Sequence, residues 1–132
     1  MPYTPDHDHR RPEGASDAIV EGLGRLSEAL ETIERARGHL YAFHQLTGTA
    51  DLTLDEVVEL LESAGQGELA RRISTELLGR EVIPGHWTFQ IVEEYDDGYY
   101  QTFKELEHQA RVELLDGRRH VYEAEMRQRR QT

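Results

Sequence analysis

An apolar stripe with the spacing of a helix-packing seam constrains the fold of this chain most. Over residues 17–47, apolar side chains recur at alternating intervals of four and three until Arg37 takes one of these positions; they are Ile19, Leu23, Leu26, Leu30, Ile33 and Leu40. This spacing is typical of a helix that packs lengthwise against other helices. The sequence therefore predicts a long first helix over about 17–47. Gly48 is its expected stop, because glycine tolerates the left-handed conformation that follows many helices.

A short helical hairpin is predicted next. Thr53 and Glu56 have the spacing of a capping box, which indicates the start of a second helix. Gly65 and Gly67 separate this helix from a third one, whose apolar residues are Leu69, Ile73, Leu77 and Leu78.

A final long helix is predicted to begin at Asp96 or Asp97 and to run to about residue 129. Its stripe consists of Tyr100, Phe103, Leu106, Ala110 and Leu114. Gly117 costs about 1 kcal/mol relative to alanine inside a helix, so a kink or a break there stays open as an alternative.

The segment 82–95 fits two patterns. Its residues alternate between polar and apolar from Trp87 to Ile91, as in a strand, whereas Trp87, Ile91 and Tyr95 also fall at helical spacing. The only pairing partner is a short apolar run across a Pro-Gly dipeptide, which favours a type II turn that suits a tight hairpin poorly. We therefore expect a helix or extended packing rather than a sheet.

Together these elements predict an all-α fold of two long antiparallel helices plus a short helical hairpin. The proline-rich residues 1–15 are expected to form a disordered tail, followed by a single helical domain over 16–132. Four helices joined by turns reverse direction each time. The end of the first helix should therefore lie near the start of the last, with Tyr41, Phe43 and His44 against residues 87–103.

A homodimer is expected from the helix lengths. A helix of about thirty residues is about 45 Å long, whereas helices of about a dozen residues reach only about 18 Å and cannot cover it. Part of the long stripes would stay exposed, and a second copy could complete the bundle there. The expected dimer surface consists of Ile19, Leu23, Leu26, Val121 and Tyr122.

The charge balance excludes two classes of partner. The formal net charge of -11 would repel nucleic acids and anionic membranes, so we expect no nucleic-acid and no membrane partner. No apolar run approaches the roughly 20 residues that span a bilayer. The chain also has no cysteine, and hence no disulfide, so a cytoplasmic location is expected.

One spacing suggests a metal site as an alternative. Glu105 and His108 form a Glu-x-x-His pair, which places a carboxylate and an imidazole on one helix face, as in ferritin-like dimetal bundles. Such sites need two of these pairs and further carboxylates, so a partner copy and Glu34 or Glu31 of the first helix would have to contribute. In this alternative the chain would bind iron or another divalent transition metal; otherwise no cofactor is expected.

Aromatic residues and histidines suggest a ligand or partner surface. Six of the ten aromatic residues lie between Trp87 and Phe103, which is also what an ordinary core would require. None of the histidines has a Ser or Asp at the spacing of a catalytic triad. The candidate residues for this surface are Tyr41, His44, His86, Trp87, Tyr95 and Tyr99.

Two segments carry a resemblance to a known group of proteins. Residues 40–48 read LYAFHQLTG and residues 84–100 read PGHWTFQIVEEYDDGYY. They resemble uncharacterised small helical proteins of high-GC actinobacteria, for which no function is assigned. The resemblance implies a bacterial, cytoplasmic setting and transfers no functional residue.

The motifs of the common enzyme classes are absent from the sequence. There is no phosphate-binding glycine loop, dinucleotide fingerprint, His-Glu-x-x-His or nucleophile elbow. We therefore expect an oligomeric helical interaction module rather than an enzyme, with a protein partner or a second copy. A helical bundle that binds a metal or a small ligand is the alternative.

Overall fold

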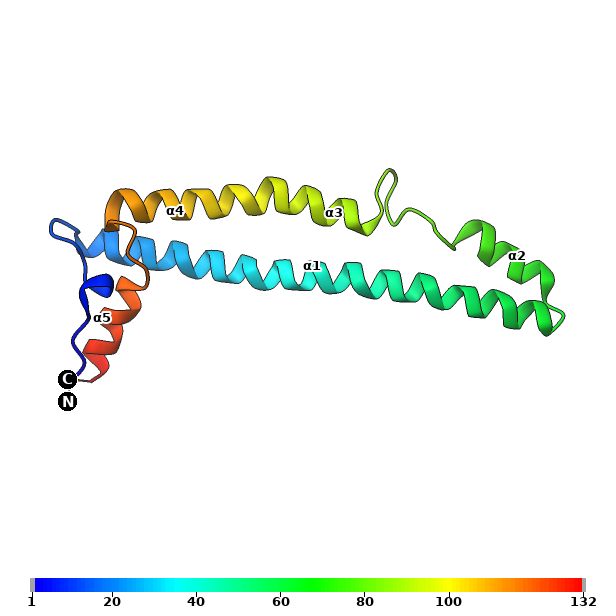
Figure 1. Ribbon diagram of the computed structural model, residues 1–132, viewed down its shortest axis with the longest axis horizontal. Coiled ribbons are helices and arrows are strands. Elements are labelled where there is room, and N and C mark those ends of the chain that lie inside the picture. The colour runs from blue at the N-terminus through cyan, green and yellow to red at the C-terminus, as the bar shows by residue number, and fades with distance from the viewer. Residues whose placement is uncertain (1, 132) are drawn as a thin grey trace. The chain divides into compact units, whose positions relative to one another are not determined.

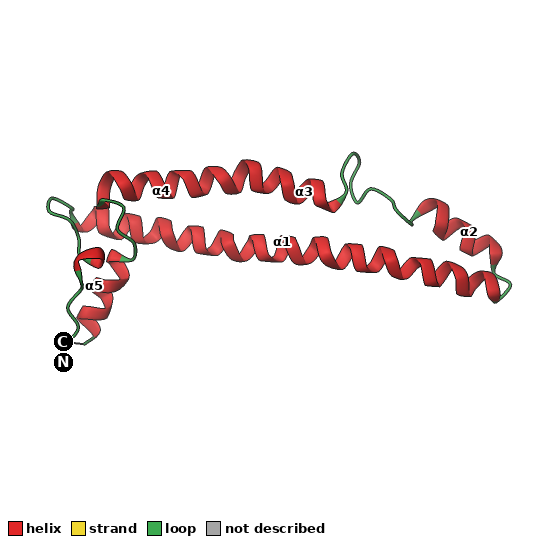
Figure 2. Ribbon diagram, viewed as in Figure 1, coloured by secondary structure: helices red, strands yellow, loops and turns green. Residues whose placement is uncertain are grey.

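The computed structural model describes residues 2–131, and it is all-α, as the sequence predicts. Its helices are α1 (Asp17–Ser63), α2 (Gly67–Glu76), α3 (Thr88–Tyr95), α4 (Gln101–Leu115) and α5 (Val121–Arg130), with a short 3-10 helix at His7–His9 and a π-helical segment at Asp96–Tyr100 (Figures 1 and 2). Within 2–131 the only β pairing is one isolated bridge between Ile83 and His86.

The chain divides into two compact units. Unit 1 consists of residues 1–35 and 98–132, and unit 2 consists of residues 36–97. The helix α1 contributes its first part to unit 1 and its second part to unit 2.

The predicted stop of the first helix at Gly48 is wrong. Gly48 lies inside α1, and the Thr53 hydroxyl does not cap a new helix but donates to the Thr49 carbonyl oxygen at 2.9 Å. The seam spacing of four and three continues beyond Gly48, to Leu54, Val58 and Leu61. One helical glycine costs about 1 kcal/mol, which this continued packing surface offsets. The two predicted helices are therefore one, and α2 folds back after a turn at Gly65.

The predicted start of the last long helix at Asp96 or Asp97 is also wrong. The helical chain begins at Thr88, where the Gln90 side chain accepts the Trp87 N–H at 2.8 Å. It then continues through the π-helical segment into α4. Residues 82–95 were expected to form a helix or extended packing rather than a sheet; Thr88–Tyr95 form the helix α3, whereas Ile83 and His86 before it form one isolated β bridge. Gly85 has the positive φ of 85° that the predicted type II turn requires.

The last helix does not run on to about residue 129 as predicted, and of the alternatives left open at Gly117 the structure has the break. The helix α4 ends at Leu115, and Asp116, Gly117 and His120 all have positive φ, so the chain turns before α5. Because of this turn, Val121 at the start of α5 packs into the core of unit 1 with Val20, Leu23 and Leu115.

The dimer surface predicted from helix lengths is therefore wrong. Leu23 is 7% exposed and Val121 only 1%, because α5 itself covers this part of α1. At Gly24 the backbone of α1 approaches Tyr122 so closely that an added Cβ would lie 2.6 Å from the Tyr122 Cβ. Only glycine allows this approach.

Residues 2–15 contact α5 and the start of α1. The Arg11 guanidinium donates to both Glu125 carboxylate oxygens, at 2.7 and 2.9 Å, and to Asp17 at 2.8 Å. These ion pairs raise the pKa of Arg11, chiefly through Glu125. The predictions of a disordered tail over 1–15 and of a single domain over 16–132 stay predictions. If residues 2–15 are ordered, the Arg11 ion pairs are the contacts that hold them against α5 and α1.

Unit 2 has a thin core. The hydrophobic residues buried in it are Ala70 and Val92, and Thr88 is its buried polar residue. Large apolar side chains such as Leu46 and Leu60 of α1 are each 69% exposed. No helix within 2–131 is both long and apolar enough to span a membrane.

Two glycines, one inside α1 and one in the turn after it, should respond to alanine substitution with opposite changes in stability. Nothing lies within 4 Å of a Cβ added at the helical Gly48, so Gly48→Ala should raise the free energy of unfolding by about 0.5–1 kcal/mol. Gly65 has φ +76°, so Gly65→Ala should lower the free energy of unfolding by about 1 kcal/mol. Urea unfolding of both variants measures this. Destabilisation by Gly48→Ala would show instead that Gly48 ends the helix.

Candidate functional site

A row of polar side chains follows α1 through unit 2 at intervals of seven residues. Arg37 Nε donates to Asp96 Oδ1 at 2.8 Å, and Asp51 Oδ1 accepts the Gly79 N–H at 2.8 Å. Between them, His44 Nδ1 and Thr88 Oγ1 share a hydrogen bond of 2.6 Å. Residues seven apart lie on the same side of a helix. These three residues, termed the polar row, therefore occupy seam positions and pair with the segments that pack there.

The strongest cluster of the polar row surrounds the Asp96 carboxylate. Its Oδ2 accepts the Tyr41 hydroxyl at 2.7 Å and Arg37 Nη2 at 3.2 Å, and Arg37 Nη2 also donates to the Tyr41 oxygen at 3.1 Å. The Arg37 hydrogen bonds hold the pKa of Asp96 below its usual value, and Tyr41 adds to this effect. In turn, the Asp96 carboxylate raises the pKa of Tyr41. An ionised Asp96 and a protonated Tyr41 suit a structural ion pair, not proton transfer near neutral pH.

Two adjoining hollows lie between α1 and residues 77–88 of unit 2. The smaller, of about 100 Å³, is bordered by Trp87, Thr88 and Gly48. The larger, of about 510 Å³, is lined by Ala50, Leu54, Leu77 and Val82, with Glu81 and others, and is termed the apolar groove. The two share Thr47, Asp51, Arg80 and Val82.

The structure brings some of the predicted surface residues together. Tyr41 and His44 contact Asp96 and Thr88, so within unit 2 this part of α1 lies against residues 88–96 of the predicted range 87–103. Trp87 borders the smaller hollow, is 48% exposed and packs edge-on against Phe89.

The other predicted surface residues lie elsewhere. His86 Nε2 is 2.9 Å from a Glu94 carboxylate oxygen, and this hydrogen bond raises the pKa of His86. Tyr95 is half-buried in α3. Tyr99 belongs to unit 1, where its ring contacts Phe103 edge-on.

Sequence reasoning missed the acidic and hydroxyl partners in the polar row. Asp96 was interpreted as a helix cap, and neither Asp51 nor Thr88 stood out. The signal that could have identified the row is the seven-residue interval from Arg37 to His44 to Asp51, which continues the apolar stripe with polar side chains.

The residues of the predicted metal site have other partners in unit 1. Glu34 accepts the Tyr100 hydroxyl at 2.8 and 2.9 Å, Glu105 accepts the Gln101 amide at 2.9 Å, and His108 lies 3.4 Å from an Arg111 nitrogen. Among residues 2–131 no group of three His, Asp or Glu side chains is arranged to hold a metal ion. The metal site stays a prediction without a supporting geometry.

Glu107, rather than Glu105, faces the packing side of α4. It is 5% exposed and accepts Arg111 Nε at 2.7 Å and the Ser27 hydroxyl at 3.2 Å. A buried carboxylate requires such partners, since an unpaired one would be costly.

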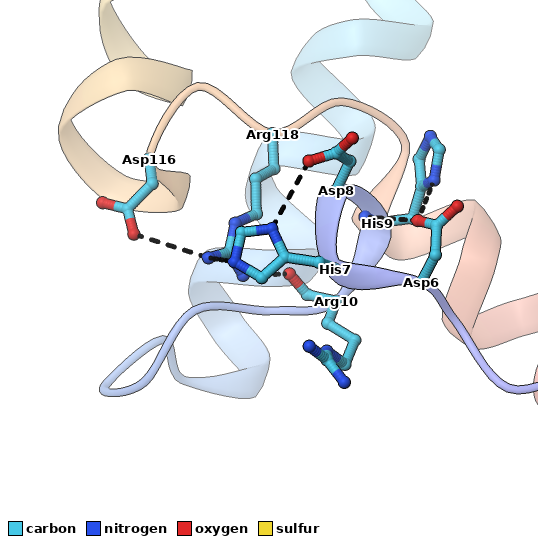
Figure 3. Close-up of polar contacts among 7 residues, drawn as sticks. All are labelled: Asp6, His7, Asp8, His9, Arg10, Asp116 and Arg118. Atoms are coloured by element: carbon cyan, nitrogen blue, oxygen red, sulfur yellow. Dashed lines mark hydrogen bonds and ion pairs between the residues drawn. The ribbon is translucent and has the colours of Figure 1, made fainter.

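A second polar cluster of unit 1 joins the first residues of the chain to the turn before α5 (Figure 3). Arg118 donates to the Arg10 carbonyl oxygen at 2.9 Å and lies 3.3 Å from His7 Nε2. His9 Nδ1 lies 2.6 Å from Asp6 Oδ1, and this contact lowers the pKa of Asp6. The guanidinium of Arg118 beside His7 would repel a metal cation at this cluster.

The sequence matches no protein-family model, and no characterised protein or solved structure matches it. The resemblance to small actinobacterial helical proteins stays a prediction.

The lowered pKa of Asp96 predicts a pH-dependent contribution to stability. A carboxyl whose pKa is lower in the folded chain stabilises it above the ordinary pKa of about 4, and this stability is lost as pH falls through the folded pKa. Asp96→Asn should therefore cost about 1–2 kcal/mol at pH 7, and the difference from the native chain should narrow towards pH 3. Urea unfolding at both pH values measures this.

The exposed neighbour Asp97 provides the control for this experiment. Asp97→Asn should leave the free energy of unfolding within about 0.5 kcal/mol of the native value at both pH values. A cost of Asp96→Asn that does not change with pH would contradict the ion-pair interpretation.

Proposed function

We propose that this chain is a helical interaction module without a catalytic role, which associates with other protein chains. One observation supports this most: among residues 2–131, fifteen large hydrophobic residues are exposed, whereas eight hydrophobic residues, alanines included, are buried. Scattered exposed apolar residues are normal, but so high a ratio indicates surfaces that another chain covers.

The polar groups of the candidate site support a non-catalytic role. Asp96 holds Arg37 and Tyr41, while His44 shares its hydrogen bond with Thr88. Each pair connects α1 to the segment that packs on it. Their chemistry is that of a part-buried polar seam, which orients helices.

The distribution of charge separates two kinds of association. Unit 1 contains eleven basic and fourteen acidic residues, whereas unit 2 contains four basic and twelve acidic ones. Two copies of unit 1 would therefore repel each other far less than two copies of unit 2. We propose that the predicted homodimer forms through unit 1, where a second copy would complete the helical bundle.

The face of α4 that carries Leu106 suits this dimer best. Leu106 is 57% exposed, and Phe103 and Tyr99 precede it at intervals of three and four, as in a helix-packing stripe. Tyr99 is 58% exposed and contacts Phe103 edge-on. A two-fold axis would place this stripe against its copy and bury it.

The dimer predicts different effects for two residues of α4 with similar exposure. Leu106→Glu should weaken dimerisation at least about tenfold, because it places a charge in the apolar contact. Val112 is 50% exposed but lies six residues further, on another side of the helix, so Val112→Glu should change the dimer constant less than about twofold. Sedimentation equilibrium at micromolar concentration measures both. A native monomer would contradict the proposed dimer, as would equal effects of the two variants.

A further inference from the structure

We infer that unit 2 binds a basic amphipathic helix of another protein, with the apolar side chains of that helix in the apolar groove between α1 and residues 77–82. This inference rests on the proposed interaction role and names the partner chemistry of one of its surfaces. It follows from the geometry of the groove, the thin core beside it and the charge around it.

The apolar groove is formed by side chains on two separate segments. Ala50 and Leu54 line it from α1, while Leu77 and Val82 line it from the end of α2 and the loop that follows. Leu77 is 51% exposed and Val82 is 38% exposed. The bond from the Gly79 N–H to Asp51 ties the two walls together, so the groove is held open by the fold itself.

The unit provides no apolar element of its own to fill the groove. Its buried hydrophobic residues are Ala70 and Val92, and neither lines the groove. Because one wall is a helix face whose lining residues are spaced by three and four, an incoming helix can place side chains at i, i+3, i+4 and i+7 against it.

Charge complementarity selects a basic partner over a second copy. Unit 2 has twelve acidic residues against four arginines, and Glu81 lies in the groove wall beside Arg80. A second unit 2 would bring the same excess of negative charge into contact, whereas lysines or arginines along a helix would offset it. The attraction should weaken with salt, because charges at a surface are screened.

Trp87 provides an intrinsic probe of this site. It is the only tryptophan of the chain, is 48% exposed and borders the hollow that shares four lining residues with the apolar groove. A helix seated in the groove should change the environment of Trp87. Its fluorescence therefore reports occupancy without a label.

The test is a titration of the full chain with model peptides of about eighteen residues. A leucine/lysine peptide with leucine at i, i+3, i+4 and i+7 should shift the Trp87 emission to shorter wavelength with saturation, and its Kd should rise several-fold between 50 and 200 mM salt. A leucine/glutamate peptide of the same pattern should leave the emission unchanged. Equal binding of both peptides, or binding of neither, would overturn the inference.

Two leucines of similar exposure provide the matched variants. Leu77→Gln, in the groove, should weaken the basic peptide at least about fivefold, whereas Leu69→Gln, on α2 outside the groove and 48% exposed in the native chain, should change its Kd less than about twofold. Circular dichroism checks that both variants keep their helix content. Equal effects of the two variants would overturn the inference.

The proposed function and this inference can fail separately. If Leu77→Gln dissociates a native dimer while Leu106→Glu does not, a second copy occupies the groove. The proposed interaction role then stands, and the inference of a basic helix in the apolar groove is wrong. If the native chain is monomeric and neither peptide binds, both proposals fail.

Discussion

In each unit, other segments pack on only one side of the helix α1, the side that carries the seam positions spaced by four and three. The rest of the structure depends on this constraint. In unit 1 the seam holds Leu23, which packs with Leu115 and Val121. In unit 2 the same spacing brings Arg37, His44 and Asp51 to the seam, and each has a polar partner there. Sliding a packed segment along α1 would leave these part-buried groups unpaired, at a cost of about 1–3 kcal/mol each. The polar row therefore fixes the register of unit 2, while apolar packing stabilises unit 1.

The same constraint explains why so much apolar surface stays exposed. Side chains of α1 that point away from the seam, such as Leu46 and Leu60, have no partner element within unit 2. The proposed partners of these surfaces differ in charge. Unit 1, with nearly balanced charge, suits association with its own copy. Unit 2, with its large acidic excess, suits a basic partner.

The sequence predicted the class of the fold and several local features. The all-α class and the turn at Pro84-Gly85 followed from periodicity and from turn chemistry, whereas the break at Gly117 was left open as an alternative to a continuous helix. It failed at Gly48 and Asp96, because a glycine and an acidic pair indicate helix ends only where no tertiary contact overrides them. The site was predicted in part: Tyr41 and His44 were identified, but their partners Asp96 and Thr88 depend on a packing register that periodicity does not specify. The dimer surface was misplaced because α5 was interpreted as a continuation of α4 and not as an element that folds back.

Hydrogen exchange of the native chain at two concentrations, read by mass spectrometry, tests the central claim that the two units serve different partners. When the concentration is raised from well below to well above the dimer constant, protection should increase for α4 amides near Leu106. It should stay unchanged for residues 50–54 and 77–82, which line the apolar groove. The account would be contradicted if amide protection increased with concentration only in the residues that line the apolar groove, or if it changed nowhere.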